Sequence, residues 1–167
     1  MGYKKAFLSL GSNLGNREQH LKNSAKQLGR SSFLNIHHIS SVYRSEPVDG
    51  AWGDDFYNMV VMCRYNGDPF ELLAEVEACE RMEGRKNKGT PSPRTLDIDI
   101  LFFSREVIST KRLTLPHPRL YHRKFVLMPL AEIAPAYRCP LTEKTISQLL
   151  TETDDNSEVE KLDYVIN

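Results

Sequence analysis

Two helices, each placed between segments with the composition of strands, set the fold that this chain can adopt. Residues 17–28 repeat apolar side chains at helical spacing, and Gly29 follows them as a stop signal. Residues 68–71, Asp-Pro-Phe-Glu, supply the cap, the proline and the acid of a helix start, and Gly84 ends that second helix. Each helix can therefore serve as one crossover between strands.

Four segments around these helices are rich in the β-branched, aromatic and other apolar residues that strands favour. They are residues 5–10, 36–43, 58–66 and 96–103, and short helices are predicted at 127–133 and 146–150. The resulting order, β-α-β-β-α-β, is typical of a ferredoxin-like α+β sandwich, here with a C-terminal helical appendage. We expect one domain over residues 1–150 and an acidic C-terminal tail over residues 151–167 that packs loosely or is disordered.

The charge of the chain is divided between this body and the tail. The 167 residues hold 22 basic and 22 acidic side chains, so the formal net charge is zero. Six of the acids and one of the bases lie in residues 151–167, which leaves residues 1–150 with 21 bases, 16 acids and a net charge of +5. Bulk charge argues against a strongly basic nucleic-acid-binding protein, while the body is cationic enough for anionic ligands.

The cysteines and the apolar runs indicate where such a chain would work. Cys63, Cys79 and Cys139 form no close pair, which argues against a disulfide framework and against a cysteine-based zinc site. No apolar run approaches the roughly 18 residues of a membrane span, and residues 6–10 are too few for a secretory leader. We expect a cytoplasmic protein with no membrane partner and no required oligomer.

Asp97 and Asp99 form the most informative polar pair. Alternate residues of a strand point to the same face, about 7 Å apart, so both carboxylates share one face of the predicted strand, and Leu101 and Phe103 continue it. The opposite, core-facing side carries Leu96, Ile98, Ile100 and Phe102. Two carboxylates at this spacing suit Mg²⁺, which binds one or two carboxylates together with phosphate oxygens and water. Simple alternation of polar and apolar residues is the alternative.

Basic side chains surround this acidic pair along the sequence. They are Arg85, Lys86, Lys88 and Arg94 before it, and Arg112, His117, His122, Arg123 and Lys124 after it. Cations around metal-binding acids can clamp a polyphosphate, because a guanidinium group forms paired bonds with phosphate oxygens. A solvated loop is the alternative for any single lysine, whereas for Arg94, close to the acids, we favour a functional role.

Aromatic residues beside an amide form a third candidate set: Phe56, Tyr57, Asn58 and Phe125. The rings could stack on a flat heterocycle while the amide binds its edge, or they could be ordinary core aromatics. The glycine-containing segment 11–15, Gly-Ser-Asn-Leu-Gly, is not a Walker A loop, because no Gly-Lys-Ser/Thr follows. Taken alone, it is a turn between strand and helix.

Five motifs, in order along the chain, resemble those of the 6-hydroxymethyl-7,8-dihydropterin pyrophosphokinase family of folate biosynthesis. They are Leu10-Gly-Ser-Asn-Leu-Gly-Asn-Arg17, Tyr43-Arg-Ser-Glu-Pro47, Phe56-Tyr-Asn58, Pro93-Arg-Thr-Leu-Asp-Ile-Asp-Ile-Leu101 and Leu115-Pro-His-Pro-Arg119. The resemblance covers residues 5–150 and implies a ferredoxin-like catalytic domain. It also implies transfer of the β,γ-pyrophosphoryl group of ATP to the pterin hydroxymethyl oxygen, with AMP as the other product.

The same resemblance, taken position by position, implies the site residues. Asp97 and Asp99 would hold two Mg²⁺ ions, and Arg85 and Arg94 would act on the transferred group. The residues implied for ATP, the co-substrate, are Glu80, Ile100, Arg112, Thr114, His117 and Arg123. Those implied for the reduced pterin are Ser45, Val48, Phe56, Asn58 and Phe125. No nucleic-acid partner is implied.

One stretch departs from the family pattern. Some members carry Arg-Trp shortly before the Pro-Arg-Thr-Leu-Asp block, and that pair helps to close their site. This chain has Thr-Pro-Ser at 90–92, in a shorter loop, so Lys86 and Lys88 can replace part of the charge but nothing replaces the indole. Loops 44–57 and 85–95 are the expected lids. From the residues alone, another Mg²⁺-dependent phosphotransferase and a non-catalytic nucleotide-binding module remain as alternatives.

Overall fold

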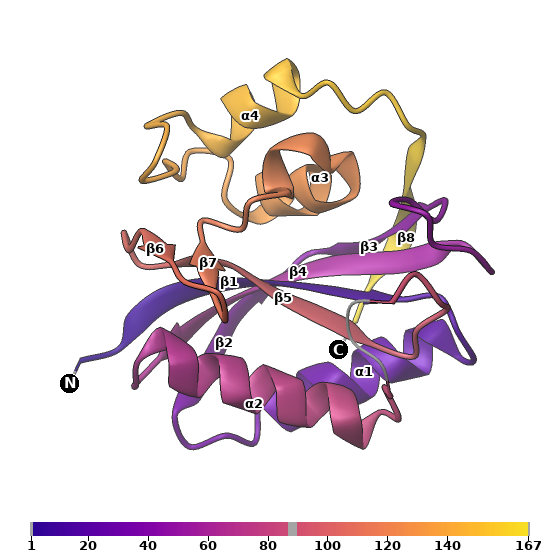
Figure 1. The fold of residues 1–167 in the computed structure, drawn as a ribbon, viewed down its shortest axis with the longest axis horizontal. Coiled ribbons are helices and arrows are strands. Elements are labelled where there is room, and N and C mark those ends of the chain that lie inside the picture. The colour runs from indigo at the N-terminus through magenta and orange to yellow at the C-terminus, as the bar shows by residue number, and fades with distance from the viewer. Residues whose placement is uncertain (1, 87–89, 167) are drawn as a thin grey trace.

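The computed structural model describes residues 2–86 and 90–166, and an antiparallel sheet forms its centre (Figure 1). Within the described residues the sheet has six strands: β1 (Lys4–Ser12), β2 (Leu34–Ile39), β3 (Ser41–Ser45), β4 (Phe56–Tyr65), β5 (Asp97–Phe103) and β8 (Val159–Val165). They lie in the order β5-β1-β4-β3-β8, and β2 pairs with the C-terminal half of β4. The fold is therefore α+β, as the sequence predicts.

Helices cover both faces of this sheet. In Figure 1, α1 (Arg17–Leu28) and α2 (Pro69–Met82) lie below it, and α3 (Lys124–Ile133) and α4 (Ile146–Glu152) lie above it. A hairpin of β6 (Ile108–Ser109) and β7 (Thr114–Leu115), followed by the 3-10 turn η1 (Leu120–His122), leads from β5 to α3. Each face has its own apolar core, with Leu8 and Leu72 in the α1–α2 core and Phe7 and Leu127 in the α3–α4 core. No helix among the described residues is long and apolar enough to cross a membrane.

The helix starts follow the signals in the sequence. The Asn16 side chain accepts a hydrogen bond from the Gln19 backbone amide at 3.1 Å, and α1 begins at Arg17. Asp68 accepts hydrogen bonds from the amides of Phe70 and Glu71, which forms a capping box before α2. These side chains satisfy amide groups that the first helical turn leaves unpaired. The predicted starts of both helices are confirmed.

The single strand predicted over residues 36–43 is instead two strands, β2 and β3. The break is at Ser40, a buried residue whose hydroxyl accepts a hydrogen bond from the Val60 amide at 2.9 Å. The Ser40 amide donates to the Val60 carbonyl, also at 2.9 Å, so the bend stays hydrogen-bonded to β4. Because of the bend, β2 pairs with the end of β4, while β3 and its last residue, Ser45, pair with the start of β4.

Because of a β-bulge in β5, the residues at the end of this strand point to the faces opposite to those predicted. Consecutive residues of β1 pair with Phe102 and Ile100, which leaves Leu101 as the extra residue of a β-bulge. The bulge reverses the alternation that follows it. Phe102 therefore joins the α3–α4 core and Phe103 the α1–α2 core, opposite to the prediction. Both aspartates precede the bulge and keep the shared face that the sequence predicts.

Part of the acidic tail belongs to the sheet. Residues 159–165 form β8, an edge strand that pairs antiparallel with β3 (Figure 1). Leu162 and Tyr164 alternate with the charged residues of β8 and pack against the α1–α2 core. The structure therefore differs here from the expectation of a loosely packed tail, because two apolar side chains anchor the strand.

Candidate active site

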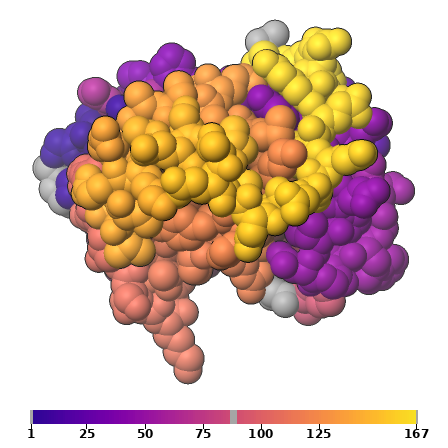
Figure 2. Space-filling view, turned by 90° about the horizontal axis from the view of Figure 1, so that it is seen from above, coloured from indigo at the N-terminus to yellow at the C-terminus, as the bar shows by residue number. Residues whose placement is uncertain are grey.

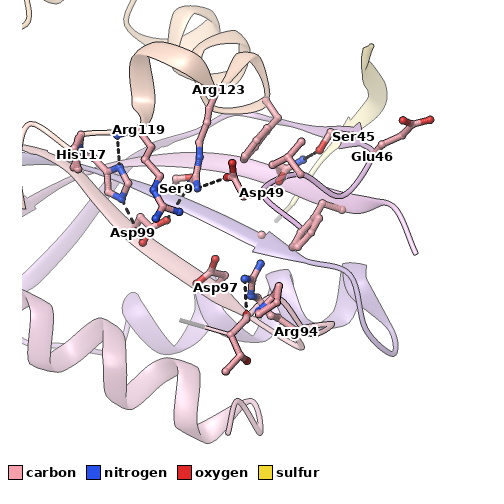
Figure 3. A pocket seen from close by; sticks show the side chains of 18 of the residues that line it. Ser9, Ser45, Glu46, Asp49, Arg94, Asp97, Asp99, His117, Arg119 and Arg123 are labelled. Atoms are coloured by element: carbon pink, nitrogen blue, oxygen red, sulfur yellow. Dashed lines mark hydrogen bonds and ion pairs between the residues drawn. The ribbon is translucent and has the colours of Figure 1, made fainter. Parts of the chain in front are cut away.

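A cavity of about 730 Å³ lies on the α3–α4 side of the sheet, beside the start of α3 (Figure 3). This volume is in the range of small-molecule sites. Side chains reach it from the ends of four neighbouring strands, from the loop 46–55 and the loop 85–95, and from the segment 117–125 that leads into α3. Segments far apart in the sequence thus meet at one cavity.

The sheet itself forms the floor. The strand register places Asp97 of β5, Gly11 of β1 and Asn58 of β4 in one row, with Asp99 beside Ser9 in the next row. Neighbouring strands lie about 4.8 Å apart, so the row runs from carboxylate to amide in about 10 Å. Gly11 keeps the space between them open, because a Cβ there would lie 3.3 Å from the Asn58 Oδ1 atom.

Charged side chains from several elements gather on one side of the cavity. We call this side, formed by Arg85, Asp97, Asp99, His117 and Arg123, the charged half. Arg85 Nη1 lies 2.7 Å from Asp97 Oδ1 and 3.8 Å from Glu80 Oε2, and it donates to the Leu96 carbonyl at 3.1 Å. The Arg85 side chain is only 5% exposed. Its charge is therefore held next to the aspartate rather than free in solvent.

His117 enters the charged half from the segment before α3. Its amide donates to the Leu101 carbonyl at 3.0 Å, which fastens the segment to β5. The Arg119 amide donates to His117 Nδ1 at 3.2 Å, so the neutral ring carries its proton on Nε2, 3.8 Å from Asp99 Oδ1. Burial lowers the pKa of His117; Asp99 opposes this effect, and the Arg123 and Arg119 guanidinium groups add to it. The ring is thus a neutral N–H donor at pH 7.

Arg123 is the residue before α3, and its side chain extends across the cavity (Figure 3). Its Nη2 donates to Asp49 Oδ2 at 2.9 Å, and its Nη1 lies 3.9 Å from Asp99 Oδ2. The guanidinium also lies over the Phe125 ring, 5.5 Å from Cζ to the ring centroid. Arg123 therefore connects the charged half to the loop 46–55 and to an aromatic ring.

Four uncharged side chains gather on the opposite side of the cavity, with Arg94 beside them. We call Ser45, Phe56, Asn58 and Phe125 the aromatic half. Asn58 Nδ2 donates to the Tyr43 carbonyl at 3.1 Å and to Ser45 Oγ at 2.9 Å, which uses both amide hydrogens and turns Oδ1 toward Gly11. Asn58 is 3% exposed. Because its amide is buried and hydrogen-bonded, its orientation is set before any ligand enters.

Asn13 joins the two loops that border the cavity. Its Nδ2 donates to the carbonyls of Trp52 and Asp54 at 3.1 and 3.2 Å, and its Oδ1 accepts from the Arg94 amide at 2.7 Å. The backbone N–H of Asn13 donates to the Arg94 carbonyl at 2.9 Å. The glycine-containing segment 11–15 therefore connects the loop 46–55 to Arg94 through the hydrogen bonds of Asn13. Arg94 itself lies beside the aromatic half, with Cζ 5.8 Å from the centroid of Phe56.

The structure brings most of the predicted site residues together. The cavity lining includes Ser45, Val48, Phe56, Asn58, Arg85, Arg94, Asp97, Asp99, His117, Arg123 and Phe125. Four predicted residues lie outside this lining: Glu80 and Ile100 are buried, whereas Arg112 and Thr114 are exposed at the β6–β7 hairpin. Lys86 is also outside the lining, and Lys88 lies outside the described residues.

Other lining residues were missed by sequence reasoning. They are Ser9, Gly11, Glu46, Asp49, Thr90, Pro91, Pro118 and Arg119. Ser9 and Gly11 reach the cavity only because β1 lies between β4 and β5, and this register has no local signal in the sequence. Gly11, Glu46, Pro118 and Arg119 belong to three of the family-like motifs, so their place in those motifs was a signal that could have found them.

The donor set of the charged half suits a hard cation. Asp97 and Asp99 point into the same cavity, and their side chains are 25% and 26% exposed (Figure 3). Within residues 2–86 and 90–166, no group of three or more His, Cys, Asp or Glu side chains gathers as a complete metal site. Mg²⁺ needs only one or two carboxylates when phosphate oxygens and water supply its other ligands. The pair therefore fits Mg²⁺ bound together with a polyphosphate.

Comparisons with known proteins identify relatives along most of the chain. The model of a family described as 7,8-dihydro-6-hydroxymethylpterin-pyrophosphokinase (HPPK) matches residues 7–135. A Bacillus subtilis protein named 2-amino-4-hydroxy-6-hydroxymethyldihydropteridine pyrophosphokinase is 39% identical over 149 residues, which cover 89% of this chain and 86% of the relative. An Aquifex aeolicus protein of the same name is 40% identical over 146 residues, covering 82% and 88%.

The fold is also similar to solved structures. Crystal structures of Plasmodium falciparum HPPK-DHPS match with a TM-score of 0.71 and 16% or 18% sequence identity, over 90% of this chain. The chain spans less than half the length of these proteins, 45% and 43%. At this identity the likeness shows the fold alone.

Proposed function

The chain belongs to the 7,8-dihydro-6-hydroxymethylpterin-pyrophosphokinase family, and on this premise we propose which of its residues carry out the reaction. The enzyme transfers pyrophosphate from ATP to the hydroxymethyl group of 6-hydroxymethyl-7,8-dihydropterin in folate biosynthesis. The roles rest on one observation, the charged half and the aromatic half of the cavity sharing a floor. A triphosphate suits the first half, and a flat heterocycle suits the second.

Asp97 and Asp99 are the proposed ligands of two Mg²⁺ ions. Their support is the donor set: two carboxylates on one face of one strand, with Arg85 fixed beside Asp97. When bound, Mg²⁺ neutralises negative charge on the triphosphate during the transfer. The part of the protein is to hold the carboxylates on a rigid strand, so that little reorganisation is needed when the nucleotide arrives.

Four cationic or N–H-donating side chains are proposed to contact the phosphates: Arg85, Arg94, His117 and Arg123. Arg85 and Arg94 would stabilise the charge that develops on the transferred group and on the leaving AMP. His117 offers its Nε2–H, and Arg123 offers its guanidinium group. These groups reach the cavity from different elements, which allows the triphosphate to be held from several sides. Such a transfer needs positioning and charge stabilisation, and we propose no general base.

In the aromatic half, the pterin is proposed to stack against Phe56 and Phe125. The free Oδ1 of Asn58 would accept a hydrogen bond from an N–H group at the edge of the ring, with Ser45 and Val48 adding contacts from β3 and the loop after it. Gly11 leaves the floor open between this ring and the carboxylates. The hydroxymethyl group could therefore point across the floor toward the charged half.

The nucleoside of ATP is proposed to lie near Glu80, Ile100, Arg112 and Thr114. Ile100 follows Asp99 on β5, and Thr114 lies on β7 shortly before His117. Buried Glu80 accepts a hydrogen bond from the Ile98 amide at 3.1 Å, so it supports β5 from behind rather than lining the cavity. These positions continue the charged half toward the β6–β7 hairpin.

We also infer that the fold is ferredoxin-like and that residues 1–150 form the catalytic domain. The strand order β5-β1-β4, with β2 and β3 both on β4, supports the first inference. The second is supported by the cavity, whose lining comes from residues 9–125 of a single chain. The substrates would be ATP and the reduced pterin, and no oligomer is required.

Product analysis tests the reaction directly. The purified protein is mixed with ATP and Mg²⁺, with and without 6-hydroxymethyl-7,8-dihydropterin, and AMP and ADP are separated. AMP is expected to form in step with consumption of the pterin. Formation of ADP, or AMP released equally without the pterin, would contradict the assignment.

A further inference from the structure

The start of α3 lacks a cap from its own sequence. The N-cap residue is Arg123, whose side chain makes no capping hydrogen bond and instead extends into the cavity. Ser, Thr, Asp or Asn at this place would normally accept a hydrogen bond from the first turn. Here the Lys124 amide donates to Asp155 Oδ2 at 2.8 Å, from 31 residues further along the chain. A residue of the acidic tail therefore caps the helix.

This contact belongs to a short segment, residues 153–157, that we call the C-terminal strap. Thr153 Oγ1 donates to the Tyr121 carbonyl at 2.7 Å, and Lys124 Nζ donates to the Ser157 carbonyl at 3.4 Å. Figure 2 shows the end of the chain, in yellow, lying beside orange residues and against the purple residues of an earlier part of the chain. The strap therefore lies along the segment that carries His117, Arg123 and Phe125 into the cavity.

The strap then continues into β8, which pairs with β3. Val159 lies opposite Ser45 in this pairing, at the edge of the aromatic half. One short stretch of chain thus contacts the segment that carries Arg123 and Phe125 and the strand that carries Ser45. It joins elements from both halves of the cavity without lining the cavity itself.

Asp155 is held firmly enough to act as a cap. The Ser157 amide donates to its Oδ1 at 2.9 Å, while Oδ2 accepts from the Lys124 amide. Burial alone would raise the pKa of Asp155, but the hydrogen bonds from Ser157 and Lys124 outweigh it and lower the pKa. A negative charge at a helix N-terminus is also favoured by the helix dipole.

We propose that Asp155 is a positioning residue for the pyrophosphoryl transfer. By capping α3 in place of residue 123, it leaves the Arg123 side chain free for the cavity and sets where Arg123 and Phe125 meet the substrates. Small displacements of such groups reduce turnover strongly, because catalysis depends on their placement to within a fraction of an ångström. The inference rests on the proposed roles of Arg123 and Phe125.

The first test compares Asp155→Ala, Asp155→Asn and Glu158→Ala. Asp155→Ala is expected to lower kcat by about tenfold or more, whereas Asp155→Asn keeps most of the activity, because an amide oxygen can accept the same hydrogen bond. Glu158 is an exposed acid of the same tail, and the described structure shows no hydrogen bond or ion pair of its side chain, so Glu158→Ala should match the wild type. kcat and both KM values are measured well below the unfolding temperature of each variant.

The second test removes the other partner of the hydrogen bond. Lys124→Pro deletes the donor N–H at the first helical position, where proline is well tolerated, and residue 123 already has the extended backbone that precedes proline. Lys124→Ala, its matched control, keeps the N–H. Both Lys124 variants lack the Nζ contact with the Ser157 carbonyl, so they differ in the amide hydrogen bond to Asp155. Lys124→Pro is expected to lose about as much activity relative to Lys124→Ala as Asp155→Ala loses relative to the wild type. This test holds even if Asp155→Ala does not fold.

If Asp155 acts through Arg123, the effects of Asp155→Ala and Arg123→Ala on kcat should not be additive. In an Arg123→Ala background, Asp155→Ala should reduce kcat by much less than it does in the wild type, because the positioned group is already gone. Equal losses in both backgrounds, or wild-type kcat and KM in both Asp155→Ala and Lys124→Pro, would overturn the proposal. Failure of the proposed function itself would show earlier, as absence of pterin-dependent AMP from the unmodified protein.

Discussion

The two halves of the cavity are held in different ways. In the aromatic half, Asn58 is buried and its amide hydrogens bond to the Tyr43 carbonyl and Ser45 Oγ, groups that a ligand has no need to displace. In the charged half, the functional groups are paired with acids: Arg85 with Asp97 at 2.7 Å, and Arg123 with Asp49 at 2.9 Å. The aromatic half is preformed, whereas the charged half is held partly by ion pairs, one between its own groups and one with Asp49 of the loop 46–55.

This difference indicates what each substrate must do on binding. A flat ring can enter the aromatic half without breaking a hydrogen bond of the protein. A triphosphate must compete for Arg123, whose partner Asp49 has a side chain that is 55% exposed. Such an exposed pair is worth about 1 kcal/mol or less, so the exchange costs little. Arg85, at 5% exposure, is expected to stay with Asp97 throughout.

The largest effect is expected from the carboxylates of the charged half. Asp97→Ala and Asp99→Ala should each lower kcat by roughly a thousandfold or more, because several kcal/mol of charge stabilisation depend on the bound metal. Asp99 is partly exposed on the sheet face, so thermal unfolding should change little in Asp99→Ala, whereas Asp97→Ala also leaves the buried Arg85 without its closest acid partner and should lower the unfolding temperature. AMP formation and thermal unfolding are measured together, with Asp163→Ala on β8 as the control.

Either variant retaining near-wild-type turnover at ordinary Mg²⁺ would remove the metal assignment. It would also remove the comparison between the halves, because the charged half would then have no cation to gather around. Asp99→Ala is the cleaner of the two, since Asp97→Ala also takes the closest acid partner from Arg85.

Local features of the site could be predicted from the sequence, and long-range ones could not. The caps at Asn16 and Asp68 bind amides two or three residues away, so the residues that form each cap lie close together in the sequence. The bulge at Leu101 depends on how β5 pairs with β1, and the contact between Asp49 and Arg123 joins residues 74 positions apart. Neither has a local pattern.

The contacts of the acidic tail also could not be predicted from its sequence. Its acids predict a solvated segment, and most of them are exposed. Leu162 and Tyr164 nevertheless anchor β8, and Asp155 bonds to a helix start that only the folded chain brings near. Composition describes the exposed face of this segment, whereas its partners are set by tertiary structure.

The next largest effect is expected in the preformed half. Asn58→Ala should raise the KM for the pterin by about tenfold to a hundredfold, because a buried hydrogen-bonding group lost from a specific site is costly. The KM for ATP should change little, since Asn58 lies across the floor from the charged half. Steady-state kinetics in each substrate check this, and Asn35→Ala, at an exposed position on β2, is the control. An equal rise in both KM values would mean that the halves are not separate.

A smaller effect, in the favourable direction, is expected at the exchangeable ion pair. Asp49→Asn should lower the KM for ATP by up to about fivefold, since it frees Arg123 from a pair worth about 1 kcal/mol or less. Asp54→Asn on the same loop is the matched control, because Asp54 contributes only its backbone carbonyl to the hydrogen bond with Asn13. A higher KM for ATP in Asp49→Asn would show that Asp49 positions Arg123 for the phosphates instead of competing with them.

The smallest effect is expected at the edge of the charged half. Arg112 is 59% exposed in its side chain, and Glu77 Oε2 lies 3.9 Å from its Nη2. Arg112→Ala should therefore raise the KM for ATP by no more than about threefold, with Lys111→Ala, its exposed neighbour, as the control. A tenfold rise specific to Arg112 would mean that the β6–β7 hairpin closes over the nucleoside when ATP binds. The charged half would then rearrange further than the exchange at Arg123 requires, and its contrast with the preformed aromatic half would be sharper than this structure shows.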